Sequence, residues 1–405
     1  MSSEKKKIGL VTRLLIGIAV GLGLGLVLPE GIIRALVTVA SIFGSYLSFI
    51  IPLMIVSFVA AGISHLSSGG AGRLLGVTVA IAYCSTLLAG SFAYAVDSAL
   101  FPAFITSDII DNFKETATAS LDPYLKFVLD PAFSVTTAIV LAFIFGIGIV
   151  ALRSSKNHQE IGEMMMKLFD GFQEIINLTL AKTIIPLLPF YIGITFAKMS
   201  YTGEVWSVLR VFWKVYVVIL CLHIVYLLFL FGVAGGVSKK SPFFYLKNQI
   251  PGYVTAVGTQ SSAMTIPINV SCAEKNGVSK SIREFVVPLC ATIHLAGSTM
   301  TIVSCATGVL MMSNMPHSFG LMMPFILTLG VVMIAAPGAP GGAIMSALSF
   351  LPMIGIPVEG ALATLMIALY LTQDSFGTAC NVSGDNAIAV IVDTFKDRIT
   401  GKKSA

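Results

Sequence analysis

Four polar side chains near the end of the chain have types and a spacing that could hold a cation. They are separated by four, three and four residues, and they are Asp374, Thr378, Asn381 and Asp385. At about 100° per residue, this spacing places them on one helix face, within a stripe about 60° wide. A charged side chain at the centre of a membrane helix costs at least about 2.5 to 3.5 kcal/mol. We therefore expect compensation by an alkali ion or by a substrate ammonium group.

Two alternatives would account for these carboxylates without a bound cation. Asp385 could lie near enough to the end of its helix to be solvated, or Asp374 could pair with a basic side chain elsewhere in the chain. Basic partners are scarce, because no Lys or Arg lies between Arg283 and Lys396. This scarcity favours a mobile cation over a fixed partner.

Two apolar stretches, 243–270 and 321–352, are interrupted by small residues and prolines. The first contains the run Gly258-Thr-Gln-Ser-Ser-Ala, and the second contains Ala335-Ala-Pro-Gly-Ala-Pro-Gly-Gly. Non-helical backbone at membrane depth is tolerated only where it is buried in protein or lines a cavity. One interruption alone would also fit a kinked helix. Two interruptions, each followed by a full span, indicate the midplane binding site of a transporter.

The span between the two interruptions also contains polar residues. His294 could carry a proton, because histidine titrates near physiological pH, although a neutral buried imidazole with a backbone partner is the commoner use. Gly297 is followed by Ser298 and Thr299. This run predicts locally open backbone whose carbonyls could coordinate an ion.

The composition excludes an ordinary soluble protein. Of 405 residues, 56% are hydrophobic and 11% are charged, whereas about 25% are charged in soluble domains. Repeated apolar stretches of roughly 20 residues or more predict a single membrane domain, 1–405, without a linker. Patterns typical of an intramembrane enzyme are absent from the spans, and the six cysteines have no paired or metal-type spacing. The predicted spans lie near 10–28, 33–65, 74–97, 131–152, 160–199, 205–236, 284–312 and 357–395.

The basic residues predict the orientation. If both interrupted stretches turn back before crossing, eight spans remain, and most of the 25 Lys and Arg residues face the cytoplasm. Full crossings would instead put Lys275, Lys280 and Arg283 outside. The net charge of +5 is explained by this topology and does not indicate nucleic acid. We predict an all-α integral membrane protein with eight transmembrane helices, two re-entrant helical hairpins and both termini cytoplasmic, in the plasma or inner membrane.

These motifs resemble the dicarboxylate/amino acid:cation symporter family, which has the glutamate transporter homologue fold. Gln260-Ser-Ser-Ala and the run from Ala335 are similar to the tips of that family's two re-entrant hairpins. His294-Leu-Ala-Gly-Ser is similar to the Asn-Met-Asp-Gly-Thr motif of the seventh span. The segment from Asp374 to Asp385 is similar to Asp-Met-x-Arg-Thr followed by Asn-Val-x-Gly-Asp in the eighth.

The resemblance covers most of the chain and implies a homotrimer of elevator-type transporters in the lipid bilayer. It implies a scaffold at approximately 1–65 and 131–236 and a mobile transport part at 74–97 and 243–395. By the same resemblance, Asp374 would hold a substrate ammonium, and Thr378 and Asn381 would contact the substrate carboxylate or backbone. The other implied substrate residues are Ser261, Ser262, Ser298, Ala339, Gly341 and Gly377. The implied sodium ligands are Asp385, Asn381, His294 and Cys290 in one site, and Thr292, Ile334 and Ala336 in another.

Departures from the family pattern bear on the substrate and the ions. Gly377 stands where relatives with acidic substrates have an arginine, and glycine cannot grip a carboxylate as arginine does. Ala296 replaces an aspartate expected to hold a further sodium ion. We expect Na⁺-coupled symport of a neutral amino acid, nearest the serine/threonine:sodium subgroup, with no other cofactor. The alternatives are proton coupling through His294, an acidic amino acid or dicarboxylate substrate, and an uncoupled facilitator or channel.

Overall fold

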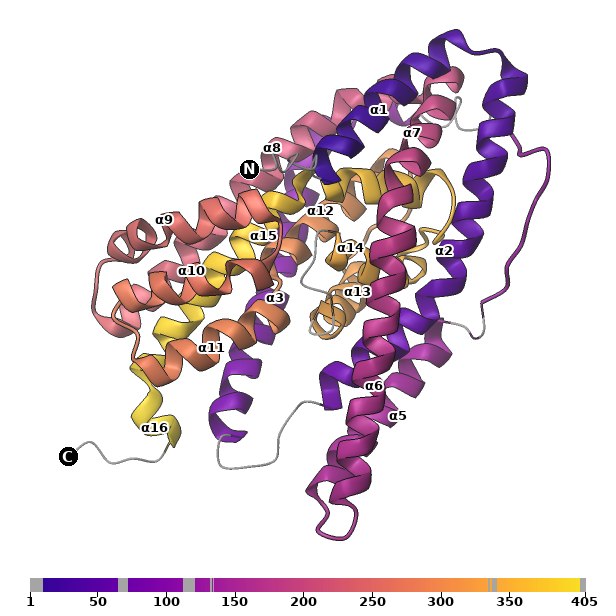
Figure 1. Ribbon diagram of the computed structural model, residues 1–405. Helices are drawn as coiled ribbons and strands as arrows, with labels where there is room; N and C mark the ends of the chain where they lie inside the picture. Colours follow the sequence, from indigo (N-terminus) through magenta and orange to yellow (C-terminus); the bar gives the residue numbers. More distant parts are fainter. Residues whose placement is uncertain are drawn as a thin grey trace, which may run out of the picture.

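The protein is a bundle of helices that cross at varied angles (Figure 1). The computed structural model describes residues 10–64, 72–111, 121–131, 133, 135–333, 336 and 341–400. Within these ranges the regular structure is entirely helical. The predicted all-α class is therefore confirmed for the part of the chain that the structure describes.

The first half of the chain forms long helices that follow the predicted spans closely. They are α1 (Leu10–Val27), α2 (Glu30–Ser64), α3 (Gly72–Leu100), α5 (Val135–Ser154), α6 (Gln159–Thr179), α7 (Ile185–Thr202) and α8 (Glu204–Ser238). A short 3₁₀ turn, η1 (Phe101–Ala103), follows α3, and a π-helical segment, η2 (Leu180–Ile184), joins α6 to α7. The connection between α6 and α7 is thus helical, in agreement with the single long span predicted at 160–199.

The second half is more broken. It contains α9 (Pro242–Thr259), α10 (Ser262–Lys275), α11 (Lys280–Ile293), α12 (Ala296–Met312), α13 (Phe319–Val332) and α14 (Gly342–Leu348). A 3₁₀ turn, η4 (Leu351–Ile354), leads to the long α15 (Ala361–Thr394) and the short α16 (Lys396–Thr400). Both predicted interruptions therefore separate two helices, α9 from α10 and α13 from α14.

Five helical stretches in the described residues are long and apolar enough to cross a membrane. They are Glu30–Met54, Arg73–Ala103, Gln159–Thr202, Val208–Ser238 and Lys280–Met312. Shorter apolar helices lie at Thr12–Val27, Val140–Ser154 and Phe319–Val332. The helix α15 is not among them although it has 34 residues, or about 51 Å at the usual rise. Its polar stripe lowers its hydropathy.

The helices pack in two groups, which Figure 1 shows on opposite sides of the bundle. One group contains α1, α2, α5, α6 and α7, and the other is built around α12 and α15 with α3, α9, α10 and α11. Helix α8 packs most extensively against α15, followed by α9 and α12. The prediction placed 205–236 in the scaffold with the first group, but the packing places α8 with the second. The apolar sequence of α8 did not reveal which neighbours its buried face meets.

Helices α12 and α15 form the buried centre of the second group. Every side chain of α12 is buried, as are most of those in α15 between Ala363 and Val392. A Cβ added at Gly297 would lie 2.5 Å from the Gly377 carbonyl oxygen, so the first turn of α12 rests directly on α15. This close contact positions the polar groups of both helices against one another.

Candidate substrate and cation site

A small cavity lies where the two interrupted helix pairs approach α12 and α15. It has a volume of about 20 Å³, which is room for about one water molecule. Its polar lining comes from the first pair, from α12 and from α15, and it contains Gln260, Ser262, Ser298, Tyr370, Asp374, Thr378 and Asn381. The remaining lining residues are Ala291, Leu295, Ala336 and Ala343. Among the described residues, Asp374 is thus the single charged side chain of this lining.

Asp374 is buried and is held by the backbone of the second interrupted pair. Its Oδ2 accepts a hydrogen bond of 2.6 Å from the Gly341 amide, and its residue is 4% exposed. Gly341 has φ of +78°, a left-handed conformation that favours glycine. Among the described residues, no Lys or Arg forms an ion pair with Asp374, in contrast to the alternative considered above.

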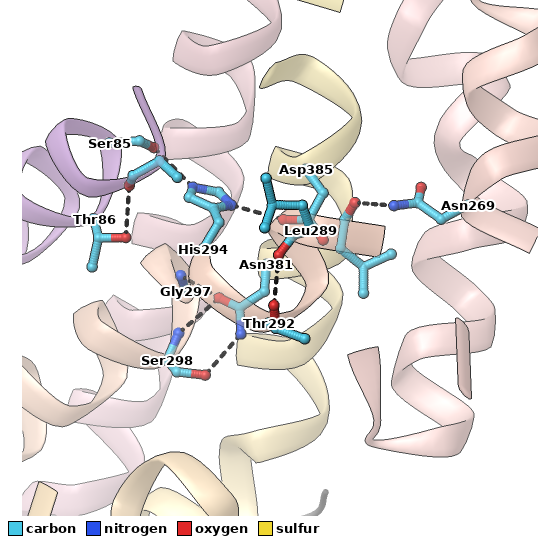
Figure 2. A network of polar contacts seen from close by, with 12 residues as sticks. Ser85, Thr86, Asn269, Leu289, Thr292, His294, Gly297, Ser298, Asn381 and Asp385 are labelled. Carbon is cyan, nitrogen blue, oxygen red and sulfur yellow. Dashed lines mark hydrogen bonds and ion pairs between the residues drawn. The ribbon is translucent and has the colours of Figure 1, made fainter. Parts of the chain in front are cut away.

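Asn381 joins α15 to the start of α12. Its Oδ1 accepts hydrogen bonds from the amides of Gly297 and Ser298, at 2.8 and 3.2 Å, and its Nδ2 donates to Ser298 Oγ at 2.9 Å (Figure 2). Amides at a helix start lack intrahelical acceptors, so this side chain satisfies two groups that the helix break exposes. The predicted open backbone at Gly297 is thus held by a side-chain cap.

The break between α11 and α12 falls at His294 and Leu295, where the backbone leaves the helical region. His294 is 1% exposed and Asp385 is 0% exposed. Nδ1 of His294 lies 2.9 Å from Asp385 Oδ1, and its Nε2 lies 2.9 Å from Ser85 Oγ of α3 (Figure 2). The expected backbone partner of His294 is therefore replaced by a carboxylate and a hydroxyl, and Asp385 is not solvated.

The neighbours of Ser85 allow two charge states of the imidazole. Tyr226 of α8 donates to the Ser85 carbonyl at 2.6 Å and also lies 2.8 Å from Ser85 Oγ. If the Ser85 hydroxyl donates to His294, the imidazole is neutral and donates through Nδ1 to Asp385. If that hydroxyl donates to Tyr226, both ring nitrogens of His294 must donate, and His294 is then an imidazolium paired with Asp385.

A hard cation needs several oxygen ligands, and beside His294 the described residues supply one carboxylate oxygen without a hydrogen-bond partner. Asp385 Oδ2 is buried and has no hydrogen-bond partner in the described residues. The Cys290 carbonyl already accepts the His294 amide at 2.8 Å. The exposed Thr292 donates its hydroxyl to the Leu289 carbonyl at 2.8 Å. No group of three His, Cys, Asp or Glu side chains gathers in the described ranges, so a cation here would depend on Asp385 and on backbone or hydroxyl oxygens.

Other residues of the predicted sites fall in three places. Ser262 and Ala336 line the cavity, whereas Ser261 caps α10 by accepting a 3.3 Å hydrogen bond from the Met264 amide. Gly377 does not line the cavity; a Cβ there would lie 3.5 Å from Thr301 Oγ1 and 3.6 Å from the Gly297 carbonyl carbon. Ile334 and Ala339 lie outside the described residues.

Comparison with known proteins identifies the family. The family model described as sodium:dicarboxylate symporter family matches residues 10–395. The chain belongs to the sodium:dicarboxylate symporter family. The resemblance drawn from the sequence motifs is thereby confirmed, and members of this symporter family are transporters and not enzymes.

Relatives within the family carry names of two kinds. Excitatory amino acid transporter 1 of Mus musculus is 30% identical over 242 residues, which cover 58% of this chain and 44% of the relative. Neutral amino acid transporter B(0) of Homo sapiens is 24% identical over 455 residues, which cover 97% of this chain and 81% of the relative. The chain thus spans less than half of the excitatory transporter, and family membership alone does not choose between these names.

Several residues of the site were not singled out from the sequence. Ser85 of α3 contacts His294, and Tyr226 of α8 contacts Ser85. His223 of α8 donates through Nε2 to the Gly297 carbonyl at 3.1 Å. Gly384 leaves room for the imidazole, since a Cβ there would lie 2.5 Å from His294 Cε1. Polar residues inside apolar spans were the available signal for Ser85 and His223, whereas Gly384 required knowledge of its neighbour.

Proposed function

We propose that the protein is a secondary active transporter that couples the entry of a neutral, serine-like or threonine-like amino acid to Na⁺. The observation that carries this proposal is a cavity whose lining, in the part of the chain that the structure describes, contains one carboxylate and no basic side chain. A zwitterionic amino acid brings an ammonium group for Asp374. Its carboxylate would be met by the hydroxyl and amide groups of Ser262, Thr378 and Asn381.

The lining favours a neutral substrate over an acidic one. A second carboxylate on the substrate would enter a closed site next to Asp374 without a Lys or Arg to compensate it, and an uncompensated buried charge costs several kcal/mol. Gly377 offers no charge at the position where the family resemblance implies arginine. A neutral substrate agrees with the name of the relative neutral amino acid transporter B(0). The name of the excitatory amino acid transporter agrees with the alternative of an acidic substrate.

Substrate entry requires the second helix pair to move. A cavity of about 20 Å³ holds about one water molecule, which is less than any amino acid occupies. The Gly341 amide already donates a hydrogen bond to Asp374 Oδ2, on the carboxylate that the ammonium would contact. We therefore propose that Gly341 and the start of α14 move away from Asp374 when the substrate enters, and return afterwards.

The packing into two groups supports an elevator movement. The cavity belongs to the group built around α12 and α15, and one of the side-chain contacts to the other group is the 2.9 Å hydrogen bond from Thr364 to Tyr191. We propose that the first group is the scaffold of a homotrimer in the cell membrane and that both termini face the cytoplasm. In this arrangement α9–α10 and α13–α14 are the two re-entrant hairpins, and α8 moves with the transport part.

Sodium coupling is proposed at Asp385, whose Oδ2 has no partner in the described residues. Asn381 and His294 lie beside it and would complete the site with backbone oxygens of the α11–α12 break. Proton coupling remains the second candidate, because the Ser85 hydroxyl can satisfy either charge state of His294. Coupling by His294 would make transport depend on pH without a sodium gradient.

Thermal unfolding of the purified protein against each amino acid, with Na⁺ or with choline, tests the substrate and the ion together. A ligand that binds only the folded protein raises Tm by mass action, so serine or threonine should raise Tm in Na⁺ and less in choline. Stabilisation by aspartate or glutamate alone would contradict the neutral substrate. Uptake into liposomes then separates the mechanisms, since accumulation driven by a sodium gradient excludes a channel or an uncoupled facilitator.

A further inference from the structure

Asp97 is a buried carboxylate that the proposed substrate and sodium sites do not use. It lies near the C-terminal end of α3 and is 0% exposed. Neither of its carboxylate oxygens has a hydrogen-bond partner in the part of the chain that the structure describes. An ionised carboxylate in this setting would be an uncompensated charge away from water, which is among the costliest arrangements in a protein.

The helices packed around Asp97 do not bring a basic group to it. On α12, Ser304 lies beside the carboxylate and Cys305 is its titratable neighbour. On α15, the uncharged Gln373 reaches Cys305, with Nε2 4.0 Å from Sγ. Neither α13 nor η1 contains a titratable residue. Ser304 Oγ and Gln373 Oε1 also lack partners among the described residues.

The charged groups of the other neighbouring helices are directed elsewhere. Lys214 of α8 lies over the rings of Phe104 and Trp213, at 5.4 and 5.9 Å from their centroids. Helices α11 and α16 carry charges at the end of the bundle where α3 begins (Figure 1). The charges of these two helices include Lys280, Arg283, Glu284, Lys396 and Asp397. His294 and Tyr226 meet α3 at Ser85, about three turns before Asp97.

Water can approach this region through an open cleft. The cleft has a volume of about 570 Å³ and is lined by Tyr94 and Ser98 of α3, together with residues between α12 and α13. Asp97 lies between Tyr94 and Ser98 in the sequence, so it is within one helical turn of both. His317 also lines the cleft, with Nδ1 2.9 Å from the Met315 carbonyl, and it is the titratable group on that side.

We propose that Asp97 is a proton-binding site, neutral in this closed arrangement, with its hydroxyl hydrogen directed at Ser304 Oγ. A proton needs one acceptor, which Ser304 supplies. A sodium ion needs several oxygen ligands, and the carbonyls of α12 around Ser304 are engaged in an unbroken helix. The proton reaches or leaves Asp97 by way of the cleft when α3 and α12 separate locally.

This site is distinct from the substrate cavity and from the pair of His294 and Asp385. It does not depend on which solute the protein carries. Its protonation would make the stability of the protein depend on pH even in the absence of any substrate. The closest link to the cavity is Gln373, which contacts Cys305 and precedes Asp374 in the sequence.

Infrared difference spectroscopy on the purified full-length protein tests the proposal directly. A protonated carboxylic acid has a carbonyl stretching band that an ionised carboxylate lacks. We expect this band at neutral pH in the native protein, its loss in Asp97→Asn and its retention in Asp108→Asn, which makes the same change at an exposed position. In Ser304→Ala the band should shift because the acceptor is gone. Identical spectra for the native protein and Asp97→Asn would overturn the proposal.

Thermal unfolding across pH gives a second, independent readout. Because the Asn side chain stays neutral, Tm of the native protein should fall relative to Tm of Asp97→Asn as pH rises. His317→Gln should leave that difference intact, which separates Asp97 from the histidine in the cleft. A band that disappears on adding Na⁺ at constant pH would show a sodium site instead and overturn the proton assignment. If Asp97→Asn does not fold, Ser304→Ala serves as the test. A carbonyl band in that variant that keeps the native frequency and does not change with pH would also overturn the proposal.

Discussion

The two carboxylates of α15, Asp374 and Asp385, share one helix face but have opposite environments. Asp374 borders the cavity, and its hydrogen bond comes from the Gly341 backbone at a helix interruption. Asp385 lies three helical turns further along, away from the cavity lining, and its Oδ1 is held by a buried imidazole. One carboxylate is thus placed to exchange partners, and the other is fixed in a side-chain network.

The helix pairs around them show the same difference. The pair α9–α10 is joined to α15 by buried amides: Asn269 donates to the Val382 carbonyl at 2.8 Å, and Asn276 donates to Asn386 Oδ1 at 3.0 Å. Among the described residues, α14 packs against α15, and the hydrogen bond that joins the pair α13–α14 to α15 comes from the Gly341 amide. Buried hydrogen bonds between two elements hold them together, so movement is expected at α13–α14 and not at α9–α10.

The largest effect is expected from Asp374→Asn. The amide can still accept from the Gly341 backbone, but it offers no negative charge to a substrate ammonium. Loss of one partner of a buried charge pair costs about 4 kcal/mol, or about 1,000-fold in affinity. Titration calorimetry with the amino acid found by thermal screening measures the change. Native affinity in this variant would remove Asp374 from the substrate site.

A smaller effect, and one on stability, is expected from Asp385→Asn. Here the carboxylate is the partner of His294, and breaking a buried pair costs about 3 kcal/mol. Thermal unfolding without ligand should show the loss, whereas Asp374→Asn should unfold near the native temperature. The sodium dependence of binding should also weaken in Asp385→Asn. Unchanged sodium dependence would contradict its role as a cation ligand.

Gly384→Ala tests whether the imidazole must lie where it does. The new Cβ would lie 2.5 Å from His294 Cε1, and overpacking of this kind costs about 2 kcal/mol. Gly377→Ala is the matched control on the same helix, because its Cβ would find ordinary contacts at 3.5 and 3.6 Å. The control should be as stable as the native protein or more stable by up to about 1 kcal/mol, because alanine favours the helix. Equal losses in both variants would show a general helix effect instead.

The sequence predicted the elements and the polar stripe because both depend on spacing along the chain. The break at Gln260, where φ is +54°, and the burial of Asp374 and Asp385 followed from glycines, prolines and helical periodicity. The sequence did not predict that Asp385 pairs with His294, because that contact depends on how α11 crosses α15. It also did not show which helices α8 packs against, since an evenly apolar helix gives no sign of its neighbours.

The contact of Gly377 shows the same limit in a single residue. Its type predicted a site without a cationic side chain at this position, and the family resemblance placed it among the substrate residues. In the structure it lies at the contact of α15 with the start of α12. In a sequence, a small residue can indicate either an open site or a close contact between helices. For Gly377, only the position of α12 distinguishes the two.

The smallest effect is expected from Tyr226→Phe, which tests the charge state of His294 next to Asp385. The hydroxyl lost in this variant donates to the Ser85 carbonyl and competes with His294 for the Ser85 hydrogen. Its loss should cost about 1 kcal/mol of stability and leave His294 Nε2 as the remaining side-chain acceptor, which favours the neutral imidazole. If His294 carries a proton during transport, the pH dependence of uptake should change in this variant while the affinity for the amino acid does not. An unchanged pH profile would leave sodium at Asp385, and not a proton on His294, as the coupling ion.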